Sequence, residues 1–162
     1  MTQRSSRRRA ATVLALLAIP TSFVFWQYLT LWSYQLFIRE HFSAEINQLE
    51  TAMLHWPENP DQDEAAREKL KKTFRSGDFY GALWSYDSHH GLKSTGFPHG
   101  GFSTYSWVST MGPESLSYGT SSDGVPLLVY KRWLPESPVM RHVQIVLYRD
   151  RVNQRMKADP RG

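Results

Sequence analysis

The stretch VPLLVYKRWLPESPVMRHVQIVLYRD, residues 125–150, decides the fold class of this chain. Two apolar runs flank a short LPESP loop, which is the pattern of an antiparallel hairpin. Along the second run, the residues of one face alternate with those of the other, as in a strand with one buried and one partly wet face. The apolar face carries Val143, Ile145 and Leu147, and the opposite face carries His142, Gln144 and Tyr148.

Three further segments with β character precede this hairpin. They read FYGALWSYD at residues 79–87, TYSWVSTM at residues 104–111 and SLSYGTS at residues 115–121. The last of them runs into Asp123-Gly124, a strong signal for a hairpin turn. We therefore expect an antiparallel sheet of about five strands within residues 77–152, and a flexible tail over residues 153–162.

A helical segment is expected upstream of the sheet, over residues 34–76. Within it, seven apolar residues follow one another at gaps of four or three, which places them on one face of a helix. This stripe consists of Tyr34, Ile38, Phe42, Ile46, Leu49, Met53 and Trp56. Pro57 and Pro60 end that helix, and a short helix is expected over residues 63–75. Helices followed by an antiparallel sheet predict an α+β domain in which the helices cover one face.

The apolar stripe has two interpretations. Either it packs on the sheet of its own domain, or it forms a seam for another membrane protein or for a second copy of the chain. In the second case, the expected partner-binding residues are Tyr34, Ile38, Phe42, Leu49, Met53 and Trp56.

A long segment without any charged side chain begins at Ala10 and runs to Ile38. Roughly 20 apolar residues in a helix cross the hydrocarbon core of a bilayer. A cleaved signal peptide has a shorter apolar region that ends at a small-residue site, and no such site follows Ala18. We therefore expect an uncleaved transmembrane helix over residues 10–33.

The charges on either side of this segment predict its direction. Residues 1–9 contain four arginines and no acid, whereas Arg39 on the far side is accompanied by Glu40, Glu45 and Glu50. Positive charge near a membrane helix favours the cytoplasmic side. The N-terminus is therefore expected in the cytoplasm and the rest of the chain outside the inner (cytoplasmic) membrane, which in a bacterial cell is the periplasm.

Composition excludes several classes of function. Four of the 19 Lys and Arg residues lie in the N-terminal tail, and the remaining 15 balance the 15 Asp and Glu residues. The exported domain is thus formally neutral, which is against a role in nucleic-acid binding. The chain has no cysteine, so disulfides, thiol catalysis and cysteine zinc sites are excluded.

Few residues offer a defined chemistry. His89, His90 and His99 lie in a glycine-rich segment near Asp87, and imidazole and carboxylate groups are good ligands for zinc or copper. Their spacing matches no known metal site, so a metal site remains a minor alternative to surface histidines. No nucleophile motif and no phosphate-binding glycine loop is present. We expect a protein that is not an enzyme and needs no cofactor.

Aromatic and hydroxyl side chains are dense between Gly100 and Gly124. Rings supply contact area and hydroxyl groups supply direction in a small-molecule site. Tyr105, Trp107 and Tyr118 are the expected ligand-binding residues if such a pocket exists. The alternatives are ordinary packing within a strand pair and a protein interface.

The segment ALWSYDSHHGLKSTGFP, residues 82–98, resembles a stretch in the extracytoplasmic sensor domains of bacterial histidine kinases. Asp87, Gly91 and Gly96 carry this likeness, and the hairpin of residues 123–152 is similar to the closing hairpin of such PAS-like or Cache-like domains. The resemblance implies a PAS-like sheet and a ligand-sensing role. Those kinases cross the membrane again toward an output module, whereas the tail of this chain carries no second apolar span. We expect any signal to pass through a partner.

The sequence thus predicts a single-pass membrane protein with an exported interaction domain. Its expected role is that of an accessory or assembly subunit, which binds other envelope proteins or itself in the lipid bilayer. The alternative is a PAS-like sensing module that works through a partner.

Overall fold

The structure is a computed structural model of the whole chain. It describes residues 3–54, 64–88, 91–96, 98–135 and 140–160. Within these ranges, the side chains of residues 3–20, 66, 86–88, 91–94, 106–108 and 140–141 lie outside the description.

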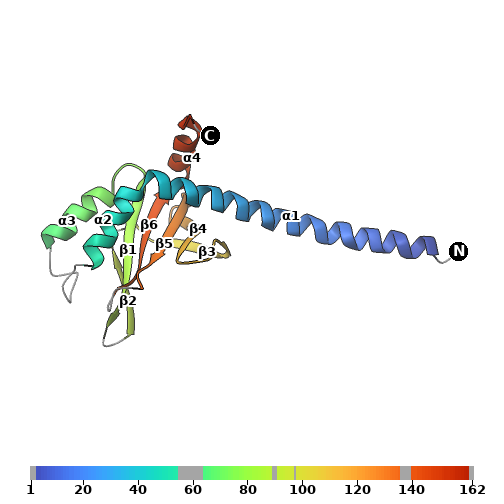
Figure 1. Cartoon of the computed structure of the whole chain (residues 1–162), viewed down its shortest axis with the longest axis horizontal. Coiled ribbons are helices and arrows are strands. Elements are labelled where there is room, and N and C mark those ends of the chain that lie inside the picture. Colours follow the sequence, from blue (N-terminus) through green and yellow to red (C-terminus); the bar gives the residue numbers. More distant parts are fainter. Residues whose placement is uncertain (1–2, 55–63, 89–90, 97, 136–139, 161–162) are drawn as a thin grey trace.

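The described residues form an α+β fold of four helices and six strands (Figure 1), which confirms the predicted fold class. The helices are α1 (Gln3–His41), α2 (Ser43–Leu54), α3 (Glu64–Phe74) and α4 (Arg149–Ala158). The strands are β1 (Phe79–Ser88), β2 (Gly91–Gly96), β3 (Phe102–Ser109), β4 (Glu114–Ser121), β5 (Pro126–Trp133) and β6 (Met140–Tyr148). They form one antiparallel sheet in the order β2-β1-β6-β5-β4-β3.

The sheet has one strand more than the five expected. The segment that follows His90 was not among the expected strands, but Gly91–Gly96 pairs with β1 as strand β2. At its end, Gly96 lies opposite Leu83, and a Cβ on Gly96 would come within 2.2 Å of the backbone oxygen of Ala82. Only a residue without a side chain permits this close approach of the two strands.

The sheet curls, so that strands distant in its order come together. Tyr80 of β1 packs edge to face against Phe102 of β3, with 6.2 Å between ring centroids, although three strands separate β1 from β3. The hydroxyl group of Tyr80 also donates to the backbone oxygen of Gly101 at 3.2 Å. A small apolar cluster of Tyr80, Leu127, Val129 and Val146 fills this concave side.

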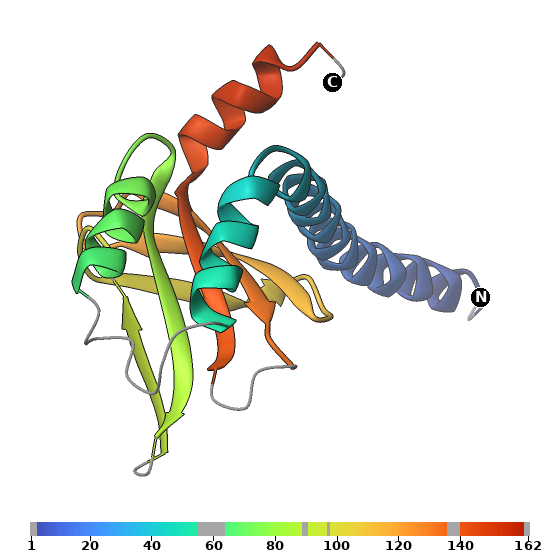
Figure 2. The same ribbon diagram turned by 60° about the vertical axis from the view of Figure 1, so that its left-hand side comes forward.

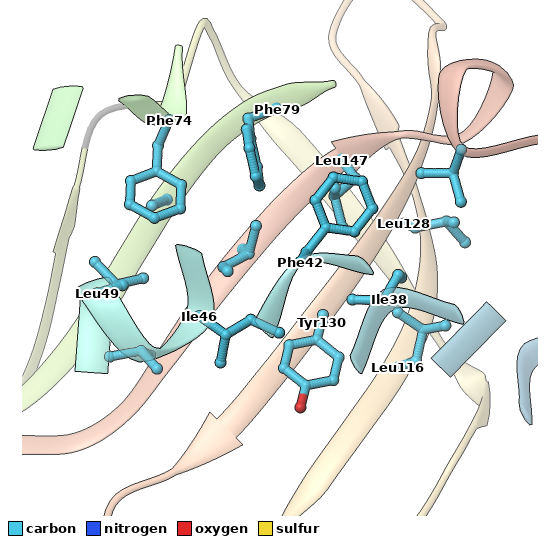
Figure 3. Packing of buried hydrophobic residues seen from close by; sticks show 14 of the residues in the cluster. Ile38, Phe42, Ile46, Leu49, Phe74, Phe79, Leu116, Leu128, Tyr130 and Leu147 are labelled. Atoms are coloured by element: carbon cyan, nitrogen blue, oxygen red, sulfur yellow. The ribbon is translucent and has the colours of Figure 1, made fainter. Parts of the chain in front are cut away.

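The main core lies on the opposite face, between the sheet and the helices (Figures 2 and 3). Val143, Ile145 and Leu147 all contribute to it, which confirms the face predicted from their alternation. Trp84 and Tyr130 are the largest side chains buried there. Full burial of one large apolar side chain stabilises the fold by about 1.5–3 kcal/mol, so this layer dominates the stability.

The apolar stripe packs on its own sheet, as the first interpretation proposed. Figure 3 shows Ile38, Phe42, Ile46 and Leu49 facing the strands. The remaining described members of the stripe, Tyr34 and Met53, are buried in the same core. The partner-binding surface expected at these positions is therefore not exposed, because the chain's own sheet covers it. Trp56 lies outside the described residues.

The sequence predicted one continuous helix for this stripe. The structure instead breaks the helix at Phe42, between α1 and α2. The backbone bonds on both sides of the break are kept, from Phe42 N to Ile38 O at 2.9 Å and from Ile46 N to Phe42 O at 3.0 Å. The break lets α2 follow the sheet while Phe42 stays in the core. It packs edge to face against Phe79 of β1 at 5.5 Å.

The tail expected to be flexible forms helix α4 instead. Val152 on this helix is fully buried in the main core. Arg155 pairs with Asp78, and Asn153 accepts a hydrogen bond from the hydroxyl group of Tyr34. These contacts supply the stabilisation that the short polar sequence lacks by itself.

Salt bridges connect the end of α1, and also α2, to the sheet. Glu114, at the start of β4, pairs with Arg39 of α1 at 3.0 Å and with Arg132 of β5 at 3.7 Å. Arg132 also reaches Glu50 of α2 at 3.0 Å. One partly buried network therefore joins both helices to two neighbouring strands.

Candidate functional site

Helix α1 carries two apolar surfaces, of which only one is covered. Its last three turns pack on the sheet, while the rest of the helix extends well beyond the domain (Figure 1). On the side away from the sheet, large apolar residues recur at gaps of four, three and four. Phe25 is 63%, Leu29 39%, Trp32 51% and Leu36 44% exposed. We call these four residues the outer stripe.

The spacing of the outer stripe is that of a seam between packed helices. Around it, Phe23, Val24, Trp26 and Tyr28 are also exposed, so large apolar side chains continue beyond the outer stripe. A large exposed apolar patch marks a surface that a protein or a membrane covers. The domain supplies no cover for the outer stripe itself.

No helix in the part of the chain with described side chains has both the length and the apolar character to cross a bilayer. Residues 10–20 of the span expected from the sequence have side chains outside that part.

A cleft of about 460 Å³ lies where α1 passes the β3–β4 end of the sheet. Its helical wall is formed by side chains spaced three or four residues apart, and its other wall comes from β3, β4, β5 and α4. The lining residues on α1 are Phe23, Trp26, Gln27 and Thr30. This volume is within the range of small-molecule sites.

Two tyrosines form the sheet wall of the cleft. Tyr105 and Tyr118 are opposite each other in the β3–β4 pairing, so their side chains share a face. The hydroxyl groups of Tyr105 and Thr120 lie 2.9 Å apart. Tyr118 also packs against the main core, which fixes its ring between core and cleft.

Arg149 is the only charged residue among the described residues that line the cleft. Its guanidinium carbon lies 5.8 Å from the centre of the Tyr118 ring. Burial raises the pKa of Tyr118, with a further increase from Tyr34, while Arg149 acts in the opposite direction. Tyr118 is therefore a neutral hydrogen-bonding group at physiological pH, and the cleft carries one positive charge.

A second group of polar side chains lies on the concave face of the sheet. His142 of β6 is opposite Ser85 of β1, with the Ser85 hydroxyl oxygen 3.0 Å from its Nε2. The amide nitrogen of Gln144 donates to the same Nε2 at 2.9 Å. The neutral ring therefore carries its proton on Nδ1, for which no partner is present among the described residues.

Burial and charge keep His142 neutral. Burial, and secondly the positive charge of Lys131, lower the pKa of His142 to about 4. The centroids of the Trp133 and His142 rings lie 5.2 Å apart in an edge-to-face contact. The ammonium nitrogen of Lys131 lies 4.4 Å from the centre of the Trp133 ring. A serine beside a neutral histidine is the start of a nucleophilic pair. However, Ser85 is only 1% exposed and His142 5%, so a substrate does not reach either group in this structure.

The structure brings together two of the three predicted ligand-binding residues. Tyr105 and Tyr118 line the same cleft. Trp107 lies on β3, but its side chain is outside the described residues. Of the three histidines, His89 and His90 are outside the described residues. The Nε2 of His99 lies 3.1 Å from the backbone oxygen of Arg75, and no metal-binding group of side chains occurs in the described part of the chain.

Sequence reasoning missed the helical wall of the cleft and its cation. Phe23 and Trp26 precede Tyr105 by about 80 positions in the sequence, and Arg149 follows it by more than 40. Only the helical wall could have been identified from the sequence, because its residues have the spacing of one helical face. These residues are Phe23, Trp26, Gln27 and Thr30. His142 and Gln144 were predicted to share a face, but their partner Ser85 depends on strand pairing.

Comparison of the chain with protein families, with curated proteins and with solved structures finds no match.

Proposed function

We propose that this chain is a non-catalytic, single-pass membrane protein and an accessory or assembly subunit of a membrane protein complex. Helix α1 anchors it in the inner membrane with the N-terminus in the cytoplasm, and the α+β domain lies on the exported side. The observation that carries this proposal is the outer stripe of α1. Four large apolar side chains at helix-packing spacing remain uncovered by the domain.

The join between α1 and the domain supports a role in assembly. Leu31 and Ile38 of α1 are completely buried in the main core, one turn or less from the exposed Trp32 and Leu36. The helix that would lie in the membrane is therefore also part of the domain's core. A partner helix that packs on the outer stripe would hold the domain in one orientation.

Membrane topology can be tested with single cysteines, because the chain has none of its own. We expect a membrane-impermeant maleimide to label Ser103→Cys, an exposed position on β3, in bacterial spheroplasts. Ser5→Cys should react only after the membrane is broken. Labelling of Ser5→Cys in intact spheroplasts together with protection of Ser103→Cys would reverse the proposed orientation.

The partner can be tested with a photoreactive amino acid at Leu36 in cells. Leu54, at the end of α2, is a matched control because it is an apolar residue of similar exposure, 39% against 44%. We expect a discrete cross-linked product from position 36 and none from position 54. Mass spectrometry of that product identifies a second copy or another membrane protein. Equal products from the two positions would contradict a specific seam.

A PAS-like sensing module is the second candidate function, and the cleft favours it. Tyr105 and Tyr118, the tyrosines expected to bind a ligand, face one cleft of ligand size. A ligand that binds only the folded state raises its melting temperature. We expect Tyr118→Ala to abolish such a shift for any metabolite that produces one. A shift that persists in this variant would place the ligand elsewhere.

A further inference from the structure

The cleft between α1 and the sheet combines three kinds of group in a defined arrangement. Phe23 and Trp26 give an apolar wall on the helix, and Tyr105 and Tyr118 give an aromatic wall on the sheet. Arg149 supplies a positive charge at the cleft. No carboxylate is present among the described lining residues.

This set of groups is complementary to an amphiphile with a negatively charged head. A guanidinium group binds phosphate through two parallel hydrogen bonds. No ion pair occupies Arg149 among the described residues, whereas Arg155 on the same helix pairs with Asp78 and Arg39 on α1 pairs with Glu114. The amide group of Gln27 and the paired hydroxyl groups of Tyr105 and Thr120 lie at the cleft for polar atoms of the ligand.

The position of the cleft favours a membrane lipid over a soluble metabolite. Its helical wall belongs to the outer end of the proposed membrane helix, where tryptophan and tyrosine rings lie at the level of lipid headgroups. If α1 lies in the bilayer as proposed, a phospholipid beside it can present its phosphate to Arg149 while its acyl chains lie on the side of Phe23.

We propose that the cleft binds a single phospholipid, with its phosphodiester at Arg149 and the start of its acyl chains along Trp26 and Phe23. This inference rests on the proposed function, because the bilayer supplies the lipid. The further proposal is that the domain holds one lipid, from the leaflet on the exported side of the membrane, between α1 and the sheet.

The test uses the full chain purified in mild detergent and native mass spectrometry of its complexes with short-chain phosphatidylglycerol. Arg149→Gln removes the charge, and Arg151→Gln is the matched control because Arg151 is exposed on the same helix and does not line the cleft. Trp26→Ala removes the apolar wall, and Trp32→Ala is its control on the outer stripe. Thermal unfolding by circular dichroism checks that each variant is folded.

We expect one bound lipid in the wild type and in both control variants. Arg149→Gln should weaken binding about tenfold or more, the effect of losing a charged hydrogen bond. Trp26→Ala should also weaken it, and inorganic phosphate alone should not displace the lipid. Equal lipid binding by Arg149→Gln and Arg151→Gln, or binding of free phosphate as tight as that of the lipid, would overturn the site.

Flotation with vesicles of phosphatidylcholine and phosphatidylglycerol separates the two proposals. A chain that floats with the vesicles but retains no lipid in mass spectrometry overturns the lipid site and leaves the anchor intact. A chain that does not float overturns the anchor, and with it the membrane source of the ligand.

Discussion

The two sides of helix α1 have similar apolar residues and opposite surroundings. On one side Leu31, Ile38 and the following Phe42 are covered by the sheet, and on the other Phe25, Trp32 and Leu36 are exposed. Both sides have the spacing of a packed helix face. The difference shows that an apolar stripe with helical spacing does not by itself indicate whether the sheet of its own domain covers it.

The two faces of the sheet repeat this contrast with polar groups. The face under the helices is filled by large apolar side chains such as Trp84 and Tyr130. The concave face has a smaller apolar cluster beside Ser85, His142 and Gln144. Most of the large apolar core therefore lies on one face, and the buried pair of Ser85 and His142 lies on the other.

The strongest test of the first contrast compares two phenylalanines of the same region. Phe42→Ala removes a ring that is 1% exposed, and we expect a loss of about 3–5 kcal/mol in the free energy of unfolding. Phe25→Ala is the control, since Phe25 is exposed, and its effect should stay within about 0.5 kcal/mol. Urea unfolding followed by circular dichroism measures both. A similar loss in the two variants would mean that Phe25 is covered.

The contrast between the faces of the sheet can be tested through pH. The pKa of His142 is about 4 in the folded protein, against about 6.5 when exposed. Between these values the unfolded chain binds a proton that the folded chain does not, so stability rises with pH across this window and falls on acidification. The loss at pH 4 relative to pH 7 is about 3 kcal/mol.

His142→Gln isolates this contribution. The variant lacks the titrating group, so the dependence of its unfolding free energy on pH between 7 and 4 should be weaker than in the wild type. Urea titrations at several pH values give the difference between the two curves. Parallel curves would show that His142 is not held neutral by burial.

A smaller effect is expected from the charges that hold α1 on the sheet. Glu114→Gln removes the carboxylate that pairs with Arg39 and Arg132, and we expect a loss of about 1–2 kcal/mol. Glu68→Gln removes an exposed pair with Lys71 on α3 and should cost less than about 0.5 kcal/mol. Thermal unfolding in low and high salt measures both. An equal effect of the two substitutions would contradict the role of Glu114.

The smallest effect on stability should come from the outer stripe. Leu29→Gln and Leu36→Gln change exposed positions, so the unfolding free energy should vary by about 0.5 kcal/mol or less. Association in detergent, measured by light scattering after gel filtration, should fall if a second copy covers the stripe. An unchanged molar mass would leave another protein or lipid as its cover.

The parts of the fold predictable from sequence are those with a clear apolar period. Val143, Ile145 and Leu147 indicated their shared face, and the short helix expected over residues 63–75 is α3, Glu64–Phe74. Strand β2 was missed because GLKSTG has no apolar alternation. This segment is a strand because it pairs with β1. Helix α4 was missed because Val152 and Met156 give it only two apolar positions toward the core.

The candidate site was predictable only in part for the same reason. Tyr105 and Tyr118 were identified from their aromatic neighbourhood, and strand pairing places them together. Nothing in the sequence indicated that Arg149 lines the cleft, because its position there depends on where α4 lies after the last strand. Local patterns thus predicted side chains on one element, and the curl and packing of the sheet determined which elements meet.

The uninterrupted backbone of α1 sets a rotational relation between its projecting half and the domain. Each residue turns a helix by about 100° and lengthens it by about 1.5 Å. One alanine inserted after Thr21, before the residues that line the cleft, would therefore turn the domain by about 100° relative to whatever holds the N-terminal half. Seven inserted residues would nearly restore the original azimuth about 10 Å farther out. A complex that requires the domain to face a fixed direction would tolerate the second insertion better than the first.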